Sequence, residues 1–261
     1  SYKSATAKNI LVSDIVPEHT TWVAGSGGEY SNGVVTFRLD SLESSKNHEF
    51  TYLLKVDEGY SSKLLYQEGF EEEFPFPDGA WYSNVLTGNV FFEFQEGVGE
   101  FGSNAYAVPS LGGEYKVAFE KTEPVTVAGS RPYLNLAHKY NTQGAIDGGN
   151  IRYSEDANAW YTFKDEVVRG KYPGELAYTS VSLPGLPGFS GNSKDWVHSF
   201  VDLKKYDTKD LYFSFFYGAS DGDATLDNWY LDNLEMVDAV FVNSQACISV
   251  DNGPEECLEA V

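Results

Sequence analysis

The chain has 261 residues, 42% of them hydrophobic and 15% aromatic, which excludes a disordered polypeptide because such a composition can bury a sizeable core. Its formal net charge of −21 argues against nucleic-acid and membrane-surface binding, since an acidic surface repels phosphate groups and anionic lipid. The same acidity suits divalent cations, solubility or a saline environment, and these remain alternatives. No apolar run approaches the roughly 20 residues of a membrane span, so we expect no membrane insertion.

The first 57 residues form a pattern of short strands separated by turns. The runs of 4–8 residues are 9–16, 20–23, 34–39 and 49–56, with clusters of Gly, Ser, Asn or Pro between them. Pro17 has no backbone N–H to donate to a ladder, so it marks the end of the first run. This spacing predicts a β-sandwich over residues 1–57.

Strands also dominate the rest of the chain, after a polar linker expected over residues 58–66. Residues 211–217 alternate, with Leu211, Phe213, Phe215 and Tyr217 on one face, and residues 133–138 alternate in the same way. No stretch has a helical period. We therefore predict a jelly-roll β-sandwich over 58–240, which makes the chain all-β, and we expect 241–261 to be a tail or the start of a further module.

The first segment resembles the Ig-like repeats of bacterial surface and secreted proteins. The resemblance rests on four features: the run Asn9–Pro17, the Gly-rich turn at 25–28, the run Gly33–Phe37, and Leu42. Ser44–Lys46 stands where that family usually has a Gly. The family's first strand would lie upstream of Ser1, and such repeats act as spacers.

The larger segment resembles the jelly-roll domains of immune-inhibitor-A-type metallopeptidases and other secreted bacterial peptidases, which are distant relatives of MAM domains. Blocks in matching order carry this resemblance across residues 68–237: Glu68–Glu71 with Phe76–Trp81; Leu134–His138; Asp147–Ser154 with Trp160; Gly188–Gly191 with Trp196, Val201–Leu203 and Tyr206; and Asp221 with Asn228–Asn233. The chain departs from the family at Asn228, at Asn233 and in a shorter turn between Ser154 and Trp160.

These resemblances imply a non-catalytic accessory region of a secreted bacterial peptidase, which would stabilise or position a catalytic domain upstream in the same chain or bind its substrate. The alternative is an adhesion or carbohydrate-binding segment of a cell-surface protein, with a protein or polysaccharide surface as partner. Either function implies a secreted or cell-surface location in a bacterium. We expect a monomeric segment of a longer precursor.

The sequence holds no motif for catalysis. It lacks a His-Glu-x-x-His helix, a Gly-x-Ser-x-Gly elbow, a P-loop and a dinucleotide-binding Gly pattern. Of its four histidines, His138 alternates with Leu134 and Leu136, so we expect a hydrogen-bonded core or sheet residue there. His198 follows Trp196 by two residues in a strand, and we expect a similar structural role. We therefore predict no enzyme activity for this segment.

A structural calcium ion is the metal site that the second resemblance implies. In its relatives, a Glu of the opening strand and an Asp of the closing strand hold one ion, and the matching residues are Glu71 and Asp232. Asp147 and Asp221 are further candidate ligands. Hard cations such as Ca²⁺ prefer oxygen ligands of this kind. The alternative is that Glu71 is a solvated strand residue and Asp232 caps a turn.

Cysteine and tryptophan each leave two possibilities. Cys247 and Cys257 would form a small-loop disulfide in an exported protein and two free thiols in a cytosolic one. The implied secretion favours the disulfide. Four tryptophans could stack on sugars or pack in the core: Trp81, Trp160, Trp196 and Trp229. We favour packing because they match the family's pattern positions.

Overall fold

The computed structural model shows two compact units that divide the chain in an unexpected way. One unit, which we call the split unit, combines Ser1–Ser62 with Ala239–Val261, and the other, the inserted unit, is Lys63–Asp238. The structure describes residues 6–44, 46–58, 60, 62–75, 79–109, 113–220, 228–239 and 245–259. No helix long and apolar enough to cross a membrane occurs within these ranges.

The split unit contains a five-stranded and a two-stranded sheet. Its strands are β1 (Thr6–Ile15), β2 (Thr20–Trp22), β3 (Glu29–Ser31), β4 (Val34–Glu43), β5 (Leu54–Val56), β21 (Gln245–Ser249) and β22 (Glu256–Glu259). The five-stranded sheet has the order β22-β21-β1-β4-β3, and β2 pairs with β5. The predicted strands 9–16, 20–23 and 34–39 are found as β1, β2 and β4, whereas only the last residues of 49–56 form a strand.

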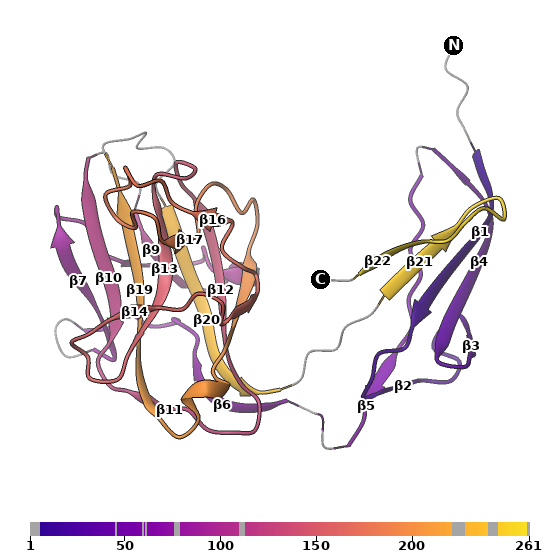
Figure 1. The fold of residues 1–261 in the computed structure, drawn as a ribbon, viewed down its shortest axis with the longest axis horizontal. Helices are drawn as coiled ribbons and strands as arrows, with labels where there is room; N and C mark the ends of the chain where they lie inside the picture. The colour runs from indigo at the N-terminus through magenta and orange to yellow at the C-terminus, as the bar shows by residue number, and fades with distance from the viewer. Residues whose placement is uncertain are drawn as a thin grey trace, which may run out of the picture. The chain divides into compact units, whose positions relative to one another are not determined.

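The C-terminal segment is part of the split unit, which corrects the expectation of a tail or a further module over 241–261. β21 runs antiparallel to β1, with Leu11 opposite Ser249 and Asp14 opposite Ala246. Figure 1 shows the yellow strands β21 and β22 beside the indigo β1. β21 thus pairs the side of β1 that faces away from β4. Pairing removes a strand edge that would otherwise leave N–H and C=O groups without ladder partners.

A small core and one disulfide hold the split unit together. Ile10, Val35 and Cys247 are its buried apolar residues in the described ranges, far fewer than in the inserted unit. Cys247 lies directly opposite Cys257 in the β21–β22 ladder, and a disulfide joins them. Small cores contribute little stability by themselves, so a covalent cross-link has a larger share in such a unit.

The inserted unit is a sandwich of two sheets, shown as two layers in Figure 1. One sheet contains β7 (Trp81–Thr87), β10 (Tyr115–Lys121), β11 (Val125–Thr126), β13 (Gly148–Ser154), β14 (Tyr161–Thr162) and β19 (Asp210–Ala219). The other contains β6 (Lys63–Glu68), β8 (Glu93–Gln95), β9 (Ala105–Val108), β12 (Pro132–Asn141), β15 (Val167–Arg169), β18 (Val197–Asp202) and β20 (Asn228–Asp238). The minor elements are β16 (Gly174–Glu175), β17 (Pro187–Gly188) and the 3₁₀ turns η1 (Glu100–Gly102) and η2 (Lys204–Tyr206).

The order of strands confirms the predicted all-β class with a jelly-roll sandwich. The six-stranded sheet has the order β14-β13-β19-β10-β7, with β11 on β19, and the seven-stranded sheet has the order β15-β18-β12-β20-β9-β8, with β6 on β20. The expected linker over 58–66 is shorter than predicted. Its second half forms the start of β6, in which Leu64 pairs with Val237 and Tyr66 pairs with Met236 across a register shift.

Strand alternation places the aromatic core between the two sheets. In β19 the inward residues Leu211, Phe213, Phe215 and Tyr217 are fully buried, as the alternation of the sequence predicts. Trp229 of β20 comes from the facing sheet, and its ring lies 6.2 Å from that of Phe215, edge to face. Buried ring pairs of this kind add to the stability gained from apolar burial.

Two adjacent glycines allow this core to close. A Cβ on Gly149 would stand 2.4 Å from the Trp229 ring, and one on Gly148 would stand 2.4 Å from the carbonyl oxygen of Phe189. No side chain fits at either position, so the pair lets β13 approach both groups closely. This explains the Gly-Gly of the Asp147–Ser154 block in terms of packing.

Removing the disulfide should weaken the split unit alone. In the chain-entropy account a loop this short stabilises by about 2–3 kcal/mol. For C247S/C257S we therefore expect the amide protons of β1 and β21 to lose that much protection free energy in native-state hydrogen exchange. The amides of β12 and β20 serve as the internal control and should keep their protection. Equal losses in both units would contradict the assignment.

Candidate functional site

A row of polar side chains crosses the outer face of the six-stranded sheet. Tyr82 of β7 lies opposite Glu120 of β10, which lies opposite Ser214 of β19. Ser214 lies opposite Arg152 of β13, which lies opposite Thr162 of β14. Residues directly opposite each other in antiparallel strands share a face, so these five side chains, which we call the polar row, lie side by side.

Hydrogen bonds hold one end of the polar row in place. The Tyr82 hydroxyl donates to Glu120 Oε2 at 2.5 Å, and the Asn84 amide lies 3.3 Å from both carboxylate oxygens of Glu120. Burial raises the pKa of Tyr82 to about 12, and its hydrogen bond to Glu120 adds to the shift. The phenol is therefore neutral at physiological pH and remains a donor to the carboxylate.

Arg152 anchors the middle of the same face. Its guanidinium lies 3.6 Å from the centre of the Phe216 ring, and its Nε donates to Asn150 Oδ1 at 3.0 Å. Burial lowers the pKa of Arg152 to about 10, against the opposing influence of Tyr172 and Glu120. The side chain thus stays charged at neutral pH while stacked on an aromatic ring, a geometry that Arg adopts readily.

A loop covers part of the outer face and leaves the polar row beside it. Leu176 and Leu183, from the segment that contains β16 and β17, pack with Ala118 and Phe216 of the sheet in a second buried cluster. The row therefore lies next to a covered area rather than on a flat sheet. This position accounts for the small exposed fraction of Glu120, 5%, although its side chain is on the outer face.

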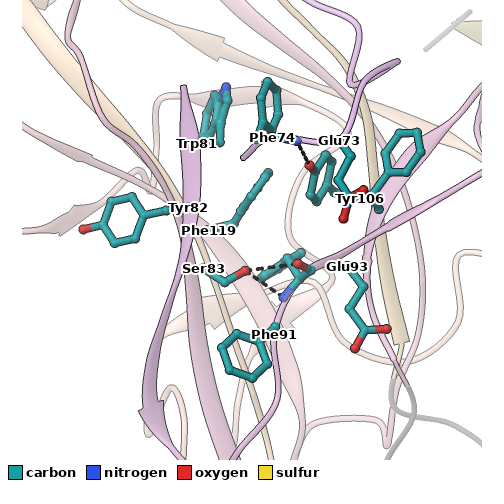
Figure 2. A pocket seen from close by; sticks show the side chains of 11 residues that line it. Glu73, Phe74, Trp81, Tyr82, Ser83, Phe91, Glu93, Tyr106 and Phe119 are labelled. Atoms are coloured by element: carbon teal, nitrogen blue, oxygen red, sulfur yellow. Dashed lines mark hydrogen bonds between the residues drawn. The ribbon is translucent and has the colours of Figure 1, made fainter. Parts of the chain in front are cut away.

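An aromatic pocket of about 590 Å³ lies beside β7, between the edges of the two sheets. Figure 2 shows the rings of Phe74, Trp81, Tyr106 and Phe119 around it, while the Tyr82 ring points away. The pocket, which we call the edge pocket, is lined by Glu73, Phe74, Trp81, Tyr82, Ser83, Phe91, Phe92, Glu93, Phe94, Tyr106 and Phe119. Trp81, Tyr106 and Phe119 are almost fully buried, and Phe91 is 40% exposed.

Backbone hydrogen bonds fix the wall of the edge pocket. The Ser83 hydroxyl donates to the Phe92 carbonyl oxygen at 3.1 Å and accepts from the Phe92 N–H at 2.9 Å. On the opposite side the Phe74 N–H donates to the Tyr106 hydroxyl at 2.6 Å, and both pairs are drawn as dashed lines in Figure 2. Because β7 alternates, Tyr82 and Asn84 belong to the outer face while Ser83 faces the pocket.

His138 is a buried structural residue, as the sequence predicts. The Trp229 N–H donates to His138 Nδ1 at 3.1 Å, and His138 Nε2 lies 2.8 Å from Ser199 Oγ. An indole nitrogen can only donate, so Nδ1 accepts and the proton of the neutral ring lies on Nε2. Ser199 in turn donates to the Gly170 carbonyl oxygen. His138 cannot act as a base toward Ser199, because the nitrogen facing that hydroxyl already carries a proton.

His198, in contrast, lies on the outer face of the seven-stranded sheet. Its Nε2 lies 2.9 Å from Glu100 Oε1, and its Nδ1 lies 3.1 Å from Asn135 Oδ1. Of the two predicted roles, a hydrogen-bonded core or sheet residue, the sheet role is the one found: His198 is in strand β18, with 40% of its side chain exposed. It joins β18 to the turn η1 and has no Ser or Cys among these partners.

Two of the predicted calcium ligands lie near each other. Asp232 is fully buried, and its Oδ2 accepts from the Glu100 N–H at 2.8 Å and from Ser103 Oγ at 2.7 Å. Burial raises the pKa of Asp232, and the nearby negative charge of Glu71 raises it further. Glu71 is held by the backbone N–H of Asn104, which donates to its Oε2 at 3.2 Å.

The surroundings of this pair are rich in oxygen. A Cβ on Gly99 would stand 2.4 Å from the Asn104 carbonyl oxygen and 2.6 Å from Asp232 Oδ2, so both oxygens lie on the same side of Gly99. Carboxylate, carbonyl and hydroxyl oxygens are the ligands that Ca²⁺ takes. A cation here would also offset the repulsion between Glu71 and Asp232. The residues present therefore fit a calcium ion.

Asp147, a further proposed ligand, has its own partner away from this pair. Asp147 is fully buried elsewhere, where its Oδ1 accepts from the Ser220 N–H at 2.7 Å, and Asp221 lies outside the described residues. In the described ranges, the one trio of His, Cys, Asp or Glu with ligand atoms within 4.8 Å of one another is Cys247, Glu255 and Cys257. Both of its sulfurs are in the disulfide, so this trio is no metal site.

The four tryptophans divide into two groups. Trp81 and Trp229 are buried in the core, which confirms the predicted packing role for both. Trp160 and Trp196 are half-buried, so packing accounts for only part of each ring. Neither of them lies in the polar row or in the edge pocket.

Comparison with known proteins gives similar folds at low identity. No family model and no curated protein matches the sequence. Among solved structures, the K1 cleaved adhesin domain of Lys-gingipain from Porphyromonas gingivalis W83 is 16% identical, with 69% of this chain and 99% of that chain covered and a TM-score of 0.39. The module TmCBM61, solved with β-1,4-galactotriose, is 10% identical over 64% of this chain and 92% of that chain, with a TM-score of 0.41.

A third similar structure is a xylan-binding domain of the CBM 22 type. It is 13% identical, and the match covers 71% of this chain and 99% of that chain with a TM-score of 0.36. Likenesses at this level assign neither a family nor a ligand.

Sequence analysis missed the residues of the polar row. Arg152 is the single charged residue of β13 and Glu120 is the single acidic residue of β10, and this was the available signal. The alternation of 211–217 already places Ser214 on the face away from the core. The pairing partners, however, lie far apart in sequence, so the row becomes visible only when the register is known.

The buried His138 should make stability depend on pH. Desolvation by burial lowers the pKa of His138 to about 3 in the folded state, whereas an unfolded His titrates near 6.5. Below about pH 6.5 the unfolded state binds the extra proton, so stability falls as pH decreases toward the folded pKa. Between pH 7.5 and pH 5.5 we expect a loss of about 1.5 kcal/mol in the unfolding free energy of the inserted unit.

Urea unfolding at the two pH values measures this loss. The matched control is H198Q, which removes an exposed histidine and keeps His138. Its unfolding free energy should fall by the same amount between the two pH values as that of the wild type. The ¹⁵N shifts of the His138 ring should show the neutral Nε2–H form at pH 5.5. A protonated His138 at that pH would rule out the assigned hydrogen bond from Trp229.

Proposed function

We propose that this chain is a non-catalytic polysaccharide-binding segment, and that the outer face of the six-stranded sheet binds the sugar. The polar row carries this proposal. Five polar side chains from five strands lie in register there, and hydrogen bonds from Tyr82 to Glu120, from Asn150 to Thr162 and from Arg152 to Asn150 hold four of them in place. A pre-organised face of this kind loses little conformational entropy when it binds a ligand.

The chemistry of the polar row suits sugar hydroxyl groups. A hydroxyl both donates and accepts, so its recognition requires groups of both kinds. Glu120 supplies acceptor oxygens, Arg152 supplies donors, and the partly exposed hydroxyl of Thr162 can do either, whereas Ser214 is buried between them in the row. The formal charges of Glu120 and Arg152 offset each other, which favours a neutral ligand over a strongly charged one.

The edge pocket extends this face with apolar surface. Tyr82 ends the polar row at β7, and Ser83, on the other side of the same strand, lines the pocket. A linear polymer that crosses the β7 edge would contact hydroxyl-binding groups first and then the exposed ring of Phe91. Sugar rings have C–H faces that pack on aromatic rings, so the combination favours a saccharide chain over a small polar molecule.

We further propose that this segment belongs to a secreted bacterial peptidase, on the basis of the ordered sequence blocks of residues 68–237. In that setting it would hold the catalytic domain near a polysaccharide or protein surface. The adhesion alternative, with no enzyme attached, shares the same binding role. The full gene distinguishes them, because a protease motif upstream supports the first and further Ig-like repeats support the second.

Calcium is the cofactor that we propose, held by Glu71 and Asp232 with the carbonyl oxygen of Asn104. The ion would join β20 to the segments that follow β6 and β8. It would act as a structural ligand of the folded state and supply no chemistry for catalysis. Binding to the folded state alone stabilises by mass action.

The polar row predicts a mutational effect on binding. Replacing Glu120 by Gln keeps the size of the side chain but removes its charge, and its partners Tyr82 and Asn84 lose a carboxylate acceptor. In affinity electrophoresis against soluble neutral polysaccharides such as galactan, xylan and mannan, we expect the wild-type chain to be retarded by at least one. E120Q should bind that polymer about tenfold more weakly, the loss expected for one charged hydrogen bond.

The matched control is E235Q, on the outer face of the other sheet. Glu235 also accepts hydrogen bonds from amides, those of Gln67 and Asn135. The E235Q variant should bind the polysaccharide as tightly as the wild type does. Equal effects of E120Q and E235Q, or no retardation of the wild type by any polymer, would overturn the proposed face. Unfolding midpoints of both variants show whether the sandwich is intact.

Chelation should lower the stability of the inserted unit. A ligand at 100 times its Kd stabilises the folded state by about 2.7 kcal/mol. We expect EDTA to lower the unfolding midpoint and added Ca²⁺ to restore it. D232N should abolish this response, whereas D238N, at a carboxylate that contacts Arg131 instead, should keep it. A wild-type midpoint that ignores both EDTA and Ca²⁺ would contradict the site.

A further inference from the structure

A second polar pocket of about 400 Å³ lies where β12 ends and β20 begins, on the outward face of the seven-stranded sheet. The register between β12 and β20 brings the lining residues of this pocket together. Lys139 lies opposite Tyr230, and Asn141 lies opposite Asn228, so four polar side chains from two neighbouring strands share one face. We call it the amide pocket.

A short loop after β17 completes the amide pocket. Asn192 forms a bridge with Asn141, and its Nδ2 donates to Asn141 Oδ1 at 2.9 Å. The Lys194 N–H donates to Asn192 Oδ1 at 2.6 Å, with Lys194 in the left-handed region at φ 65°. The Ser193 N–H donates to the Tyr140 carbonyl oxygen at 3.0 Å. The loop is thus fastened to β12 through Asn192 and Ser193, and it holds Lys194 at the pocket in a sparsely populated conformation.

Charge sets the amide pocket apart from the rest of the surface. The described residues of its lining are two lysines, three asparagines, two tyrosines and Val98, with no carboxylate among them. The chain as a whole has 39 acidic against 18 basic residues, and the edge pocket and the pocket beside Lys164 both contain two carboxylates. Within the described residues, neither Lys139 nor Lys194 forms an ion pair. Two ammonium groups with no counter-charge among the described residues favour an anionic ligand.

We infer that the amide pocket binds an acidic sugar residue, carboxylated or sulfated, with its anionic group between Lys139 and Lys194. A simple inorganic anion would use the lysines alone. The carboxamides of Asn141, Asn192 and Asn228 can each donate to and accept from a sugar hydroxyl. The half-buried ring of Tyr230 offers an apolar face beside them. A polyhydroxylated anion matches all of these groups at once.

This inference rests on the proposed function only in that the ligand is a saccharide. The amide pocket is on the opposite sheet from the polar row and shares no residue with it. The two sites also differ in ligand charge, because the row pairs a carboxylate with a guanidinium while the pocket holds lysines alone. Each site can therefore be present without the other.

The test is calorimetric titration of the full chain in 0.15 M salt, where the long-range repulsion from its net charge is screened. The probes are trigalacturonate, a sulfated galactose trisaccharide and neutral galactotriose. We expect at least one acidic probe to bind about tenfold more tightly than galactotriose. K139Q/K194Q should reduce that affinity about tenfold, since Gln keeps hydrogen-bonding capacity but removes the charge.

Two control variants separate this site from other effects. K164Q/K171Q makes the same change in net charge in the pocket that also contains Asp165 and Glu175, and it should leave binding unchanged. E120Q alters the polar row and should leave the acidic probe bound, even if neutral polysaccharides no longer bind. Amide shifts of Asn192 and Tyr230 in the wild-type chain give a second readout that does not depend on a folded variant.

Three results would overturn the inference. The first is that the acidic probes do not bind, or bind no more tightly than galactotriose. The second is that K139Q/K194Q binds them like the wild type, with the amide shifts outside this pocket. The third is that E120Q abolishes their binding, which would place the acidic sugar on the polar row instead. Loss of neutral polysaccharide binding alone would count against the proposed function and leave this inference standing.

Discussion

Trp229 places an indole N–H in the middle of the inserted unit, where it must find a hydrogen-bond acceptor. The residues that provide this hydrogen bond connect several strands of the unit. A buried donor without a partner costs about 1–3 kcal/mol. Trp229 is fully buried, so its N–H needs an acceptor within the protein. The acceptor is His138 Nδ1, and the protonated Nε2 donates a hydrogen bond to Ser199 Oγ, which donates to the Gly170 carbonyl oxygen. This chain of polar contacts links β20, β12 and β18 and ends just after β15, all within or beside one sheet.

The same arrangement also ties the two sheets together. Phe215 from the facing sheet packs against the Trp229 ring, and Gly149 provides the space for it. Because strands alternate, every inward ring fixes the outward neighbours on either side of it. Phe215 lies between Ser214 and Phe216, and Trp229 lies between Asn228 and Tyr230. The polar row and the amide pocket are thus the outer surfaces of a tightly packed aromatic layer, which keeps their side chains in register.

Local patterns were enough to predict much of this fold. The alternation in 211–217 and 133–138 placed β19 and β12, and the alternation of His138 with leucines identified a hydrogen-bonded core or sheet residue. Pairing between distant segments was less accessible. Nothing local in 245–259 shows that it pairs with β1, because strand partners depend on contacts across more than 200 residues. Lys139 and Lys194 are 55 positions apart, and Glu120 and Arg152 are 32 apart, so neither site could be assembled from the sequence alone.

The way the split unit closes has a mechanical consequence. The chain enters the split unit through β1 and leaves through β21 and β22, and these strands are neighbours in one sheet. The disulfide joins β21 to β22. Tension applied to the two flanking ends would therefore pass through the β1–β21 ladder without passing through the inserted unit. The sandwich that contains the polar row and the amide pocket would therefore not bear this tension. A sugar bound there would remain on a folded platform until the split unit itself had been pulled open.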